Sequence, residues 1–499
     1  MRQAYCIGID QSTQGTKAML FDGLGNLLLR TDKSHAQLID EKGWVEHDPE
    51  EIYQNTLRAV KDLLEQSRID RAEIACVGIS CQRETALAWN RYTGKPVYNA
   101  IVWQCARGED ICRRLEKSGV SEEVRKRTGL LLSPYFSAAK LAWIMEQVPG
   151  VRIEAEQGNI CCGTVDSWLV YRLTKGKEFR TDYSNASRTQ LFNITTLAWD
   201  EKLLGYFGIP RVCMAEVTDS DGFFGETDFD GLLPGAVPIH GVLGDSHGAL
   251  FGQGCMQRGM MKTTYGTGSS IMMNIGEKPV FSDLGIVTSL AWKTEGKVQY
   301  VLEGNINYTG AVITWMKDRL GLLTAPGESE TLACEANPSD KTYLVPAFTG
   351  LGAPYFRSDV SAVFCGMSRT TGKAELVKAG LESIAYQITD VVSLMKKAAE
   401  IPKIELRVDG GPTNNKWLMQ FQSDILGSTI YVPDAEELSG IGAAYAAGLG
   451  SGIYKKEILF EKKHGTLYTP VMSDAERERK YKGWQDAVSV LLKSNAENE

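Results

Sequence analysis

The feature that most constrains the fold of this chain is a strand–loop–strand pattern that occurs twice, about half a chain apart. The first copy, "YCIGIDQSTQGTKAMLF", has an apolar strand ending at Asp10, a loop of small and polar residues, and a strand from Ala18 to Phe21. The second copy, "GMMKTTYGTGSSIMMNIG", has a strand ending near Thr264, the loop "YGTGS" and a strand over 270–274. Two such units predict duplicated domains that face each other.

Strand and helix patterns alternate through the rest of the chain. "EIACVGISC" predicts a buried strand, and "EEIYQNTLRAVKDLLEQS" predicts an amphipathic helix. Such alternation predicts α/β domains with largely parallel sheets. Because 499 residues exceed one ordinary core, we expect two domains, 1–250 and 251–499, with the boundary near Phe251. The polar tail 495–499 is expected to be disordered.

Composition excludes several classes of protein. A formal net charge of −8 argues against nucleic acid as a partner, and no apolar run reaches the roughly 18 residues of a membrane span. Eleven cysteines, an odd number without a C-x-x-C pair, indicate reduced thiols, and no histidine spacing indicates zinc. We therefore expect a cytoplasmic protein with no nucleic-acid partner and no membrane span.

The first loop has the residues of a phosphate site without the spacing of a P-loop or a dinucleotide motif. Its backbone N–H groups and the hydroxyls of Ser12 and Thr13 could surround phosphate oxygens, with Lys17 adding a positive charge. Asp10 is placed to hold Mg²⁺ through water. A plain polar hairpin, with Asp10 capping the turn, fits the same residues.

Two further loops strengthen the phosphate interpretation. "YGTGS" on the second unit could oppose the first loop, and "DGGPTNN" (409–415) follows a strand and opens a helix. Its paired glycines would let a nucleoside approach the backbone closely. Three such elements in this order are hard to explain as unrelated turns.

A third group of residues suits a small hydroxylated molecule. Arg83 and Glu84 follow a buried strand, and Trp103 ends another, which provides polar forks beside a flat apolar wall. The alternative is a surface ion pair next to a core tryptophan. Asp245, in "VLGDSHGAL", stands at the end of a strand, where it could serve in catalysis or as a helix N-cap.

These residues and several longer stretches resemble the FGGY family of carbohydrate kinases, and among them most closely the glycerol kinases. The stretches include "GWVEHDP", "QRET", "TGKPVYNAIVWQC", "TDYSNASRT", "VPAFTGLGAPY", "LESIAYQ" and "LMQFQSDILG", and the similarity covers about residues 5–490. One family signature is met by Tyr135, Ser137, Lys140 and Trp143. A second is met around 362–382 except at Gly380.

The resemblance implies two actin-like (ribonuclease H-like) ATPase domains with a cleft between them. The first would bind the acceptor and phosphates, and the second the nucleotide. It implies ATP and Mg²⁺ as cofactors and phosphorylation of a primary hydroxyl of a small polyol, glycerol to glycerol 3-phosphate, with Asp245 as general base. The site residues are then Arg83, Glu84, Trp103, Tyr135, Asp245, Ser246 and Ser270 for the acceptor; Ser12, Thr13, Gln14, Lys17, Thr267, Gly310, Thr314, Gly411 and Asn415 for the nucleotide; and Asp10 (through water) and Asp245 for the metal.

The chain departs from the glycerol kinase pattern at the acceptor side. Ser246 and His247 replace two glutamines after the catalytic acid, and Ser270 replaces a phenylalanine that forms part of an apolar cup. The loss of an aromatic face removes roughly 1.5–3 kcal/mol of apolar contact and opens space. A longer polyol or ketose (a tetritol, pentitol or pentulose) is therefore an alternative acceptor, as is glycerol in a pocket rebuilt by a neighbouring residue.

Other departures and alternatives concern the nucleotide and the assembly. Gln14, Lys17 and Thr314 replace other residues of the family pattern, and Lys17 keeps the charge without the two-pronged grip of arginine. The resemblance implies a homo-oligomer, a dimer or tetramer, but no effector site is carried over. A non-catalytic nucleotide-dependent actin-like module is a remote alternative, since it would not need Asp245 beside Arg83 and Glu84.

Overall fold

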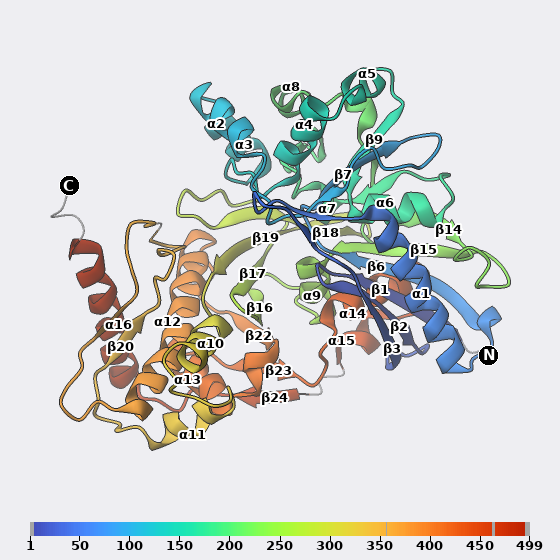
Figure 1. Ribbon diagram of the computed structural model, residues 1–499. Coiled ribbons are helices and arrows are strands. Elements are labelled where there is room, and N and C mark those ends of the chain that lie inside the picture. Colours follow the sequence, from blue (N-terminus) through green and yellow to red (C-terminus); the bar gives the residue numbers. More distant parts are fainter. Residues whose placement is uncertain (1–3, 356, 462–464, 495–499) are drawn as a thin grey trace.

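The computed structural model describes residues 4–355, 357–461 and 465–494, and the polar tail 495–499 lies outside them. Two large sheets form its centre, with helices gathered around each (Figure 1). The first sheet has the order β14-β15-β6-β1-β2-β3. Its strands are β1 (Tyr5–Gln11), β2 (Gly15–Phe21), β3 (Leu27–Ser34), β6 (Ile74–Cys81), β14 (Phe223–Thr227) and β15 (Val237–Gly244).

The second sheet has the order β18-β19-β17-β16-β22-β23-β24. Its strands are β16 (Met260–Tyr265), β17 (Ser269–Gly276), β18 (Val287–Thr294), β19 (Lys297–Ile306), β22 (Glu405–Asp409), β23 (Ile430–Pro433) and β24 (Gly465–Tyr468). In both sheets an antiparallel hairpin, β1–β2 or β16–β17, is followed across the sheet by two parallel strands, β6 and β15 or β22 and β23. The duplicated unit predicted from the sequence is confirmed.

The expectation of largely parallel sheets was wrong, because both sheets are mixed. The pairs β1–β2, β2–β3, β16–β17, β17–β19 and β18–β19 are antiparallel. Short loops impose this pairing on β1–β2, β2–β3, β16–β17 and β18–β19, since a few residues can join only antiparallel neighbours, whereas a parallel connection needs a long crossover.

A smaller third sheet has the order β4-β5-β8-β7-β9. Its strands are β4 (Leu38–Ile39), β5 (Val45–His47), β7 (Ala86–Asn90), β8 (Ala100–Ile101) and β9 (Ile160–Thr164). Two-stranded pairs form from β10 (Arg180–Asp182) with β13 (Glu216–Thr218), β11 (Phe192–Asn193) with β12 (Ala198–Trp199), and β20 (Tyr343–Val345) with β21 (Val363–Cys365).

The helices fall on either side of the predicted domain boundary in the sequence. Before the boundary near Phe251 lie α1 (Pro49–Ser67), α2 (Glu109–Lys117), α3 (Ser121–Thr128), α4 (Ser137–Gln147), α5 (Val151–Glu156), α6 (Val165–Leu173), α7 (Tyr183–Ala186), α8 (Glu201–Phe207) and most of α9 (Asp245–Gly252). After it lie α10 (Gly310–Asp318), α11 (Glu328–Glu335), α12 (Lys373–Ala398), α13 (Lys416–Leu426), α14 (Leu438–Gly450), α15 (Lys456–Glu461) and α16 (Asp474–Ser494).

Helix α14 belongs to the second half of the sequence but packs on the first sheet, against β1, β6 and β15 (Figure 1). Its sequence, "LSGIGAAYAAGLG", is rich in small residues, so the helix can lie very close to the strands. A Cβ atom added to Gly78 would lie 2.2 Å from the carbonyl oxygen of Ala443, and one added to Gly8 would lie 2.9 Å from that of Gly440. These glycines therefore permit the approach that covers this face of the sheet.

Candidate active site

Two adjacent cavities lie near the loop between β16 and β17, one lined by both halves of the chain and the other by the second half alone. The acceptor cavity, as we call the first, has a volume of about 630 Å³, and the nucleotide pocket has one of about 760 Å³. Gly266 and Thr267, in the loop between β16 and β17, line both. The acceptor cavity is lined from the first half by Thr13, Arg83, Glu84, Trp103, Tyr135, Asp245, Ser246 and Ala249, and from the second half by residues that include Lys262, Thr264, Ser270 and Asn305.

Asp245 lines the acceptor cavity at the end of β15. It is the first residue of α9, whose N-cap is Gly244, so the alternative of an N-cap role is wrong for its position. Its Oδ1 atom accepts a hydrogen bond from the backbone N–H of Ser246 at 2.6 Å and lies 3.2 Å from Nε of Arg83. The side chain is 35% exposed, so a molecule in the cavity can reach the carboxylate.

Arg83 is fixed by an acid from the other sheet. Its two terminal nitrogens donate to Glu303 of β19 at 2.7 and 3.1 Å, a bidentate pair between buried side chains. Burial alone would raise the pKa of Glu303, but the guanidinium groups of Arg188 and Arg83 outweigh it and hold the pKa well below its usual value. Glu303 therefore stays ionised and keeps Arg83 aimed at the cavity.

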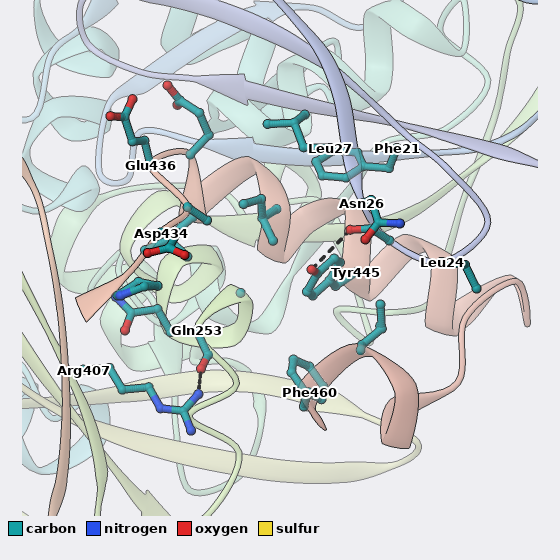
Figure 2. Close-up of a pocket in the computed structure, with 18 of the residues that line it drawn as sticks. Phe21, Leu24, Asn26, Leu27, Gln253, Arg407, Asp434, Glu436, Tyr445 and Phe460 are labelled. Atoms are coloured by element: carbon teal, nitrogen blue, oxygen red, sulfur yellow. Dashed lines mark hydrogen bonds between the residues drawn. The ribbon is translucent and has the colours of Figure 1, made fainter. Parts of the chain in front are cut away.

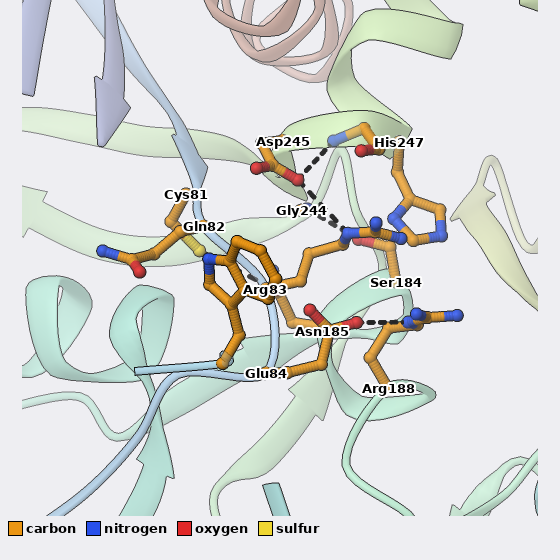
Figure 3. A network of polar contacts seen from close by, with 12 residues as sticks. Cys81, Gln82, Arg83, Glu84, Ser184, Asn185, Arg188, Gly244, Asp245 and His247 are labelled. Atoms are coloured by element: carbon orange, nitrogen blue, oxygen red, sulfur yellow. Dashed lines mark hydrogen bonds and ion pairs between the residues drawn. The ribbon is translucent and has the colours of Figure 1, made fainter. Parts of the chain in front are cut away.

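Glu84 is fixed in the same way by a buried arginine (Figure 3). Nε of Arg188 donates to Oε1 of Glu84 at 2.5 Å, and Nη1 of Arg188 lies 3.3 Å from Glu303. Glu84 also has a positive φ of 61°, a conformation that residues other than glycine adopt infrequently. The interpretation of Arg83 and Glu84 as a surface pair is wrong, because both are buried and each binds a different partner.

An aromatic wall faces these charges. The rings of Trp103 and Tyr135 meet edge to face, with centroids 5.6 Å apart, and Nε1 of Trp103 donates to Oγ1 of Thr13 at 3.0 Å. The buried ammonium of Lys140 donates to the carbonyl oxygens of Pro134, Tyr135 and Phe136 at 2.7, 2.5 and 3.2 Å. The signature lysine therefore fixes the turn that carries Tyr135.

The three departures at the acceptor side lie in different places. Ser246 and Ser270 line the acceptor cavity, and the buried Oγ atom of Ser270 has no hydrogen-bond partner among the described residues. His247 is fully buried, with Nε2 3.3 Å from Oγ of Ser289. Burial, with Arg83 nearby, holds the pKa of His247 well below its usual value. The imidazole is therefore a neutral group behind the cavity rather than part of its lining.

The nucleotide pocket is formed by the second half of the chain. It is lined by the predicted residues Thr267, Gly310, Thr314, Gly411 and Asn415. Gly310 begins α10, and Gly411 begins a short 3₁₀ turn (Gly411–Asn414). Asn415 caps α13 by accepting from the N–H of Leu418 at 2.8 Å. Residues at helix starts therefore line this pocket together with apolar side chains such as Ile313, Trp315 and Leu381.

The residues predicted in the first loop are split by the structure. Thr13 lines the acceptor cavity. Oγ of Ser12 donates to the carbonyl oxygen of Gly15 at 3.0 Å, and Gln14 is exposed, so neither side chain lines a cavity described above. The loop approaches the cavity through Thr13.

Lys17 pairs with an acid at the start of α14 and does not line the acceptor cavity. Its Nζ lies 2.6 Å from Glu437, which also pairs with Arg30. Glu437 lines a separate cavity of about 610 Å³ between the β2–β3 turn and the start of α14 (Figure 2). The positive charge expected at the phosphates is therefore already paired.

Asp10 lies under the first loop, buried at the end of β1. Burial raises the pKa of Asp10 to about 6, although the ammonium of Lys17 lowers it. Its Oδ1 atom has no hydrogen-bond partner among the described residues. A buried carboxylate oxygen left without a partner fits a hard divalent cation or a water bound to one, so the site suits Mg²⁺.

Sequence reasoning missed three charged residues of this site: Arg188, Lys262 and Glu303. Each stands in a stretch that otherwise reads as a strand or turn, and Glu303 and Arg188 meet their partners across a long sequence distance. The signal that could have found Glu303 is a lone carboxylate within the apolar strand "YVLEGNI", because such a charge needs a buried partner.

Comparison with protein families matches almost the whole of this architecture. The N-terminal domain of the FGGY family of carbohydrate kinases matches residues 5–252, and its C-terminal domain matches residues 261–451. The chain belongs to this family, and the predicted fold class is confirmed. It is an ATP-dependent phosphotransferase with an alcohol group as acceptor.

Individual relatives lie within one branch of the family. The chain is 48% identical to glycerol kinase 1 of Thermotoga maritima over 490 residues, covering 98% of this chain and 99% of that one. It is 45% identical to the glycerol kinase of Natranaerobius thermophilus, with 98% and 99% covered. The structure of Plasmodium falciparum glycerol kinase with ADP matches with a TM-score of 0.93, 35% identity and 98% of each chain covered.

A more distant structure shares the fold alone. Ligand-bound xylulose kinase from Lactobacillus acidophilus matches with a TM-score of 0.87 at 19% identity, over 99% of this chain and all of that one. Within the part of the chain that the structure describes, no helix has the length and apolar character needed to cross a membrane.

Proposed function

We propose that the chain transfers the γ-phosphoryl group of ATP to a primary hydroxyl of glycerol, which yields glycerol 3-phosphate, with Asp245 as the general base. The observation that carries this proposal is the position of Asp245, a reachable carboxylate between Arg83 and the loop that joins the two cavities. Relatives named glycerol kinase at 45–48% identity over nearly the full length support glycerol as the acceptor.

The acceptor hydroxyls meet the charged residues, and the carbon chain meets the aromatic wall. Arg83 donates to one hydroxyl, and Glu84 accepts from another, while Trp103 and Tyr135 pack against the C–H edges. Because Glu303 and Arg188 already fix the two charged groups, little ordering is needed when the acceptor binds. Asp245 then takes the proton of the attacking hydroxyl as its oxygen bonds to phosphorus, and ADP leaves.

The nucleotide is placed with its adenosine against Gly310, Thr314, Gly411 and Asn415, and its terminal phosphate near Thr13 and Thr267. Ser12, Gln14 and Lys17 would act only after a change from the observed side-chain positions. Mg²⁺, held by Asp10 through water and by Asp245, would supply neutralisation of phosphate charge.

A second candidate acceptor is a longer polyol or ketose. Ser270 lines the acceptor cavity, and its buried hydroxyl has no partner among the described residues, so a rotation of the side chain toward the cavity would let an extra acceptor hydroxyl satisfy it. Ser246 lines the same cavity. The neutral imidazole of His247 is buried behind this surface, which weakens its part in the argument.

An acceptor panel tests the proposal. Purified chain is given Mg-ATP with glycerol, dihydroxyacetone, erythritol, ribitol, xylulose or ribulose, and release of ADP is followed, with Asp245→Asn as the control for contaminating kinases. We expect glycerol to give the highest kcat/KM. A higher value for a tetritol or pentulose would favour the second candidate, and no transfer to any acceptor would refute the kinase proposal.

We also propose the domain division, the assembly and the compartment. The strands of the first sheet precede residue 251 and those of the second follow it, which supports domains 1–250 and 251–499, although α14 crosses between them. A homo-oligomer, dimer or tetramer, follows from the family resemblance and is tested by light scattering. The eleven cysteines are free thiols, which supports a cytoplasmic location.

A further inference from the structure

The acceptor cavity has only two basic residues in its described lining, Arg83 and Lys262. A phosphoryl group that enters carries negative charge on its peripheral oxygens, and kinases stabilise this charge with positioned cations. Arg83 is already committed to carboxylates, because it forms a bidentate pair with Glu303 and lies 3.2 Å from Asp245. Lys17, in turn, is paired with Glu437 outside this lining.

Lys262 is the cation that remains. It is a buried residue of β16, and its Nζ donates to Oγ1 of Thr264 at 2.9 Å. Within the described residues no carboxylate lies within 4 Å of this nitrogen, the distance that defines the ion pairs of this structure. An ammonium group has three N–H donors, so two are left for a ligand.

Nearby acids favour the charged form of Lys262, but none of the described ones forms an ion pair with it. Burial holds the pKa of the Lys262 amine below its usual value and Arg83 lowers it further, whereas Asp409, Asp245 and Glu303 oppose this shift. Asp409, on the adjacent strand β22, is itself engaged by Nε2 of Gln253. An unpaired buried cation surrounded by acids that bind other groups is an arrangement suited to an anionic ligand.

The position of Lys262 in the sheet directs it to the reaction region. Lys262 and Thr264 are two residues apart on one strand and therefore point to the same face. Their strand runs directly into the loop that carries Thr267, which lines both the acceptor cavity and the nucleotide pocket. Asp245 lines the same cavity from the first sheet, so the terminal phosphate must pass between this aspartate and β16.

We propose that Lys262 is a phosphate-binding catalytic residue, whose ammonium contacts the phosphoryl group as it moves from ADP to the acceptor. This inference rests on the proposed kinase function. The bond between the γ-phosphorus and the oxygen of ADP breaks, and the bond to the acceptor oxygen forms. The acceptor proton goes to Asp245, and Lys262 keeps its protons and donates hydrogen bonds.

Two substitutions test this role. Lys262→Met keeps an unbranched side chain one atom shorter and removes its charge, and Lys262→Arg restores the charge. Lys297→Met is the matched control, because Lys297 is exposed at the start of β19 in the same sheet. The measurements are kcat and KM with Mg-ATP and glycerol, the affinities for ADP and for a non-hydrolysable ATP analogue by calorimetry, and thermal unfolding.

We expect Lys262→Met to lower kcat about 100-fold or more, as loss of a donor at a developing charge does in other enzymes. Its affinity for the ATP analogue should fall about tenfold, while those for ADP and glycerol change by less than about threefold, since only the γ-phosphate loses a contact. Lys262→Arg should recover part of the preference for the analogue, and Lys297→Met should match the parent chain.

Two results would overturn the inference. One is a kcat within about threefold of the parent with an unchanged preference for the analogue over ADP. The other is an equal loss of affinity for ADP and the analogue with a lower unfolding temperature, which would show a purely structural role. Failure of the parent chain to phosphorylate any acceptor would refute the proposed function instead, and the two nucleotide affinities would still decide the role of Lys262.

Discussion

The acceptor end of this site, at the acceptor cavity, and its nucleotide end, at the nucleotide pocket, are lined by different kinds of residues. At the acceptor end, buried side chains from both sheets fix one another, as Glu303 fixes Arg83 and Arg188 fixes Glu84. At the nucleotide end, the lining combines glycines and residues at helix starts with apolar side chains such as Ile313, Trp315 and Leu381. Under the proposed function, the first arrangement would recognise a small molecule by fixed charges, and the second would accommodate a larger ligand in an open pocket.

The largest expected effect comes from Asp245, where the two ends meet. Asp245→Asn keeps the shape of the side chain and removes the proton acceptor, so kcat should fall by about 10²–10⁴. Binding of ADP and of glycerol should change little, because each end keeps its own contacts. Rapid-quench assays with calorimetry measure both quantities, and near-normal turnover would contradict the role of Asp245 as base.

Glu303→Gln should have the next largest effect, and it should act on the acceptor end. Removal of one partner of a buried ion pair leaves Arg83 and Arg188 short of negative charge and costs about 3–5 kcal/mol of unfolding free energy. We expect a higher KM for the acceptor and an unchanged affinity for ADP. Urea unfolding and steady-state kinetics measure these effects, and equal losses at both ends would mean that the two regions are not independent.

The loss of stability caused by Glu303→Gln should depend on pH. The pKa of Glu303 in the folded chain lies below its usual value of 4.5, so the stability that it contributes is present above pH 4.5 and is lost as the pH falls below that value. The difference in stability between the parent chain and Glu303→Gln should therefore narrow below pH 4.5. Unfolding curves at a series of pH values measure this difference, and a constant difference would contradict an ionised Glu303.

Two neighbouring glycines test the nucleotide end with smaller effects. Gly410 has φ 98°, and an added Cβ would lie 2.0 Å from the carbonyl oxygen of Tyr265, so Gly410→Ala should cost about 1–3 kcal/mol of stability and weaken nucleotide binding. Gly411 has no heavy atom within 4 Å of an added Cβ among the described residues. Gly411→Ala should weaken nucleotide binding with stability within about 0.5 kcal/mol of the parent.

Ser270 should give the smallest effect. Ser270→Ala removes a hydroxyl that has no partner among the described residues, so stability should change little and glycerol turnover should stay within about threefold of the parent. Turnover should fall only for a longer polyol that uses this hydroxyl. Ser269→Ala is the control, because Oγ of Ser269 is hydrogen-bonded to Oγ1 of Thr309 at 2.7 Å. An equal loss for all acceptors would remove the argument for a longer substrate.

Local patterns in the sequence predicted the parts of this molecule that depend on neighbours in the chain. The hairpins β1–β2 and β16–β17 and the turn at Gly410 and Gly411 are of this kind. Positions at strand ends indicated Arg83, Glu84, Trp103 and Asp245, the family resemblance added Tyr135 and the roles of all five, and all five line one cavity.

The remainder depends on partners that are remote in sequence. Lys17 meets Glu437 across 420 residues, and Arg83 meets Glu303 across 220, so neither pairing is visible in a local window. The place of His247 behind the cavity depends on the direction of one side chain at a helix start. Tertiary packing determines these partners and side-chain directions, and the periodicity of the sequence does not specify them.

The crossing of α14 onto the first sheet has a consequence for synthesis of the chain on the ribosome. Until residues 438–450 emerge, the face of β1, β2 and β6 that carries Cys6, Met19, Phe21 and Cys76 has no cover, although its strands were made hundreds of residues earlier. The nascent first half therefore exposes an apolar surface until that point, and this surface can bind chaperones or lead to aggregation. For the same reason, a fragment of residues 1–250 should aggregate when it is expressed alone.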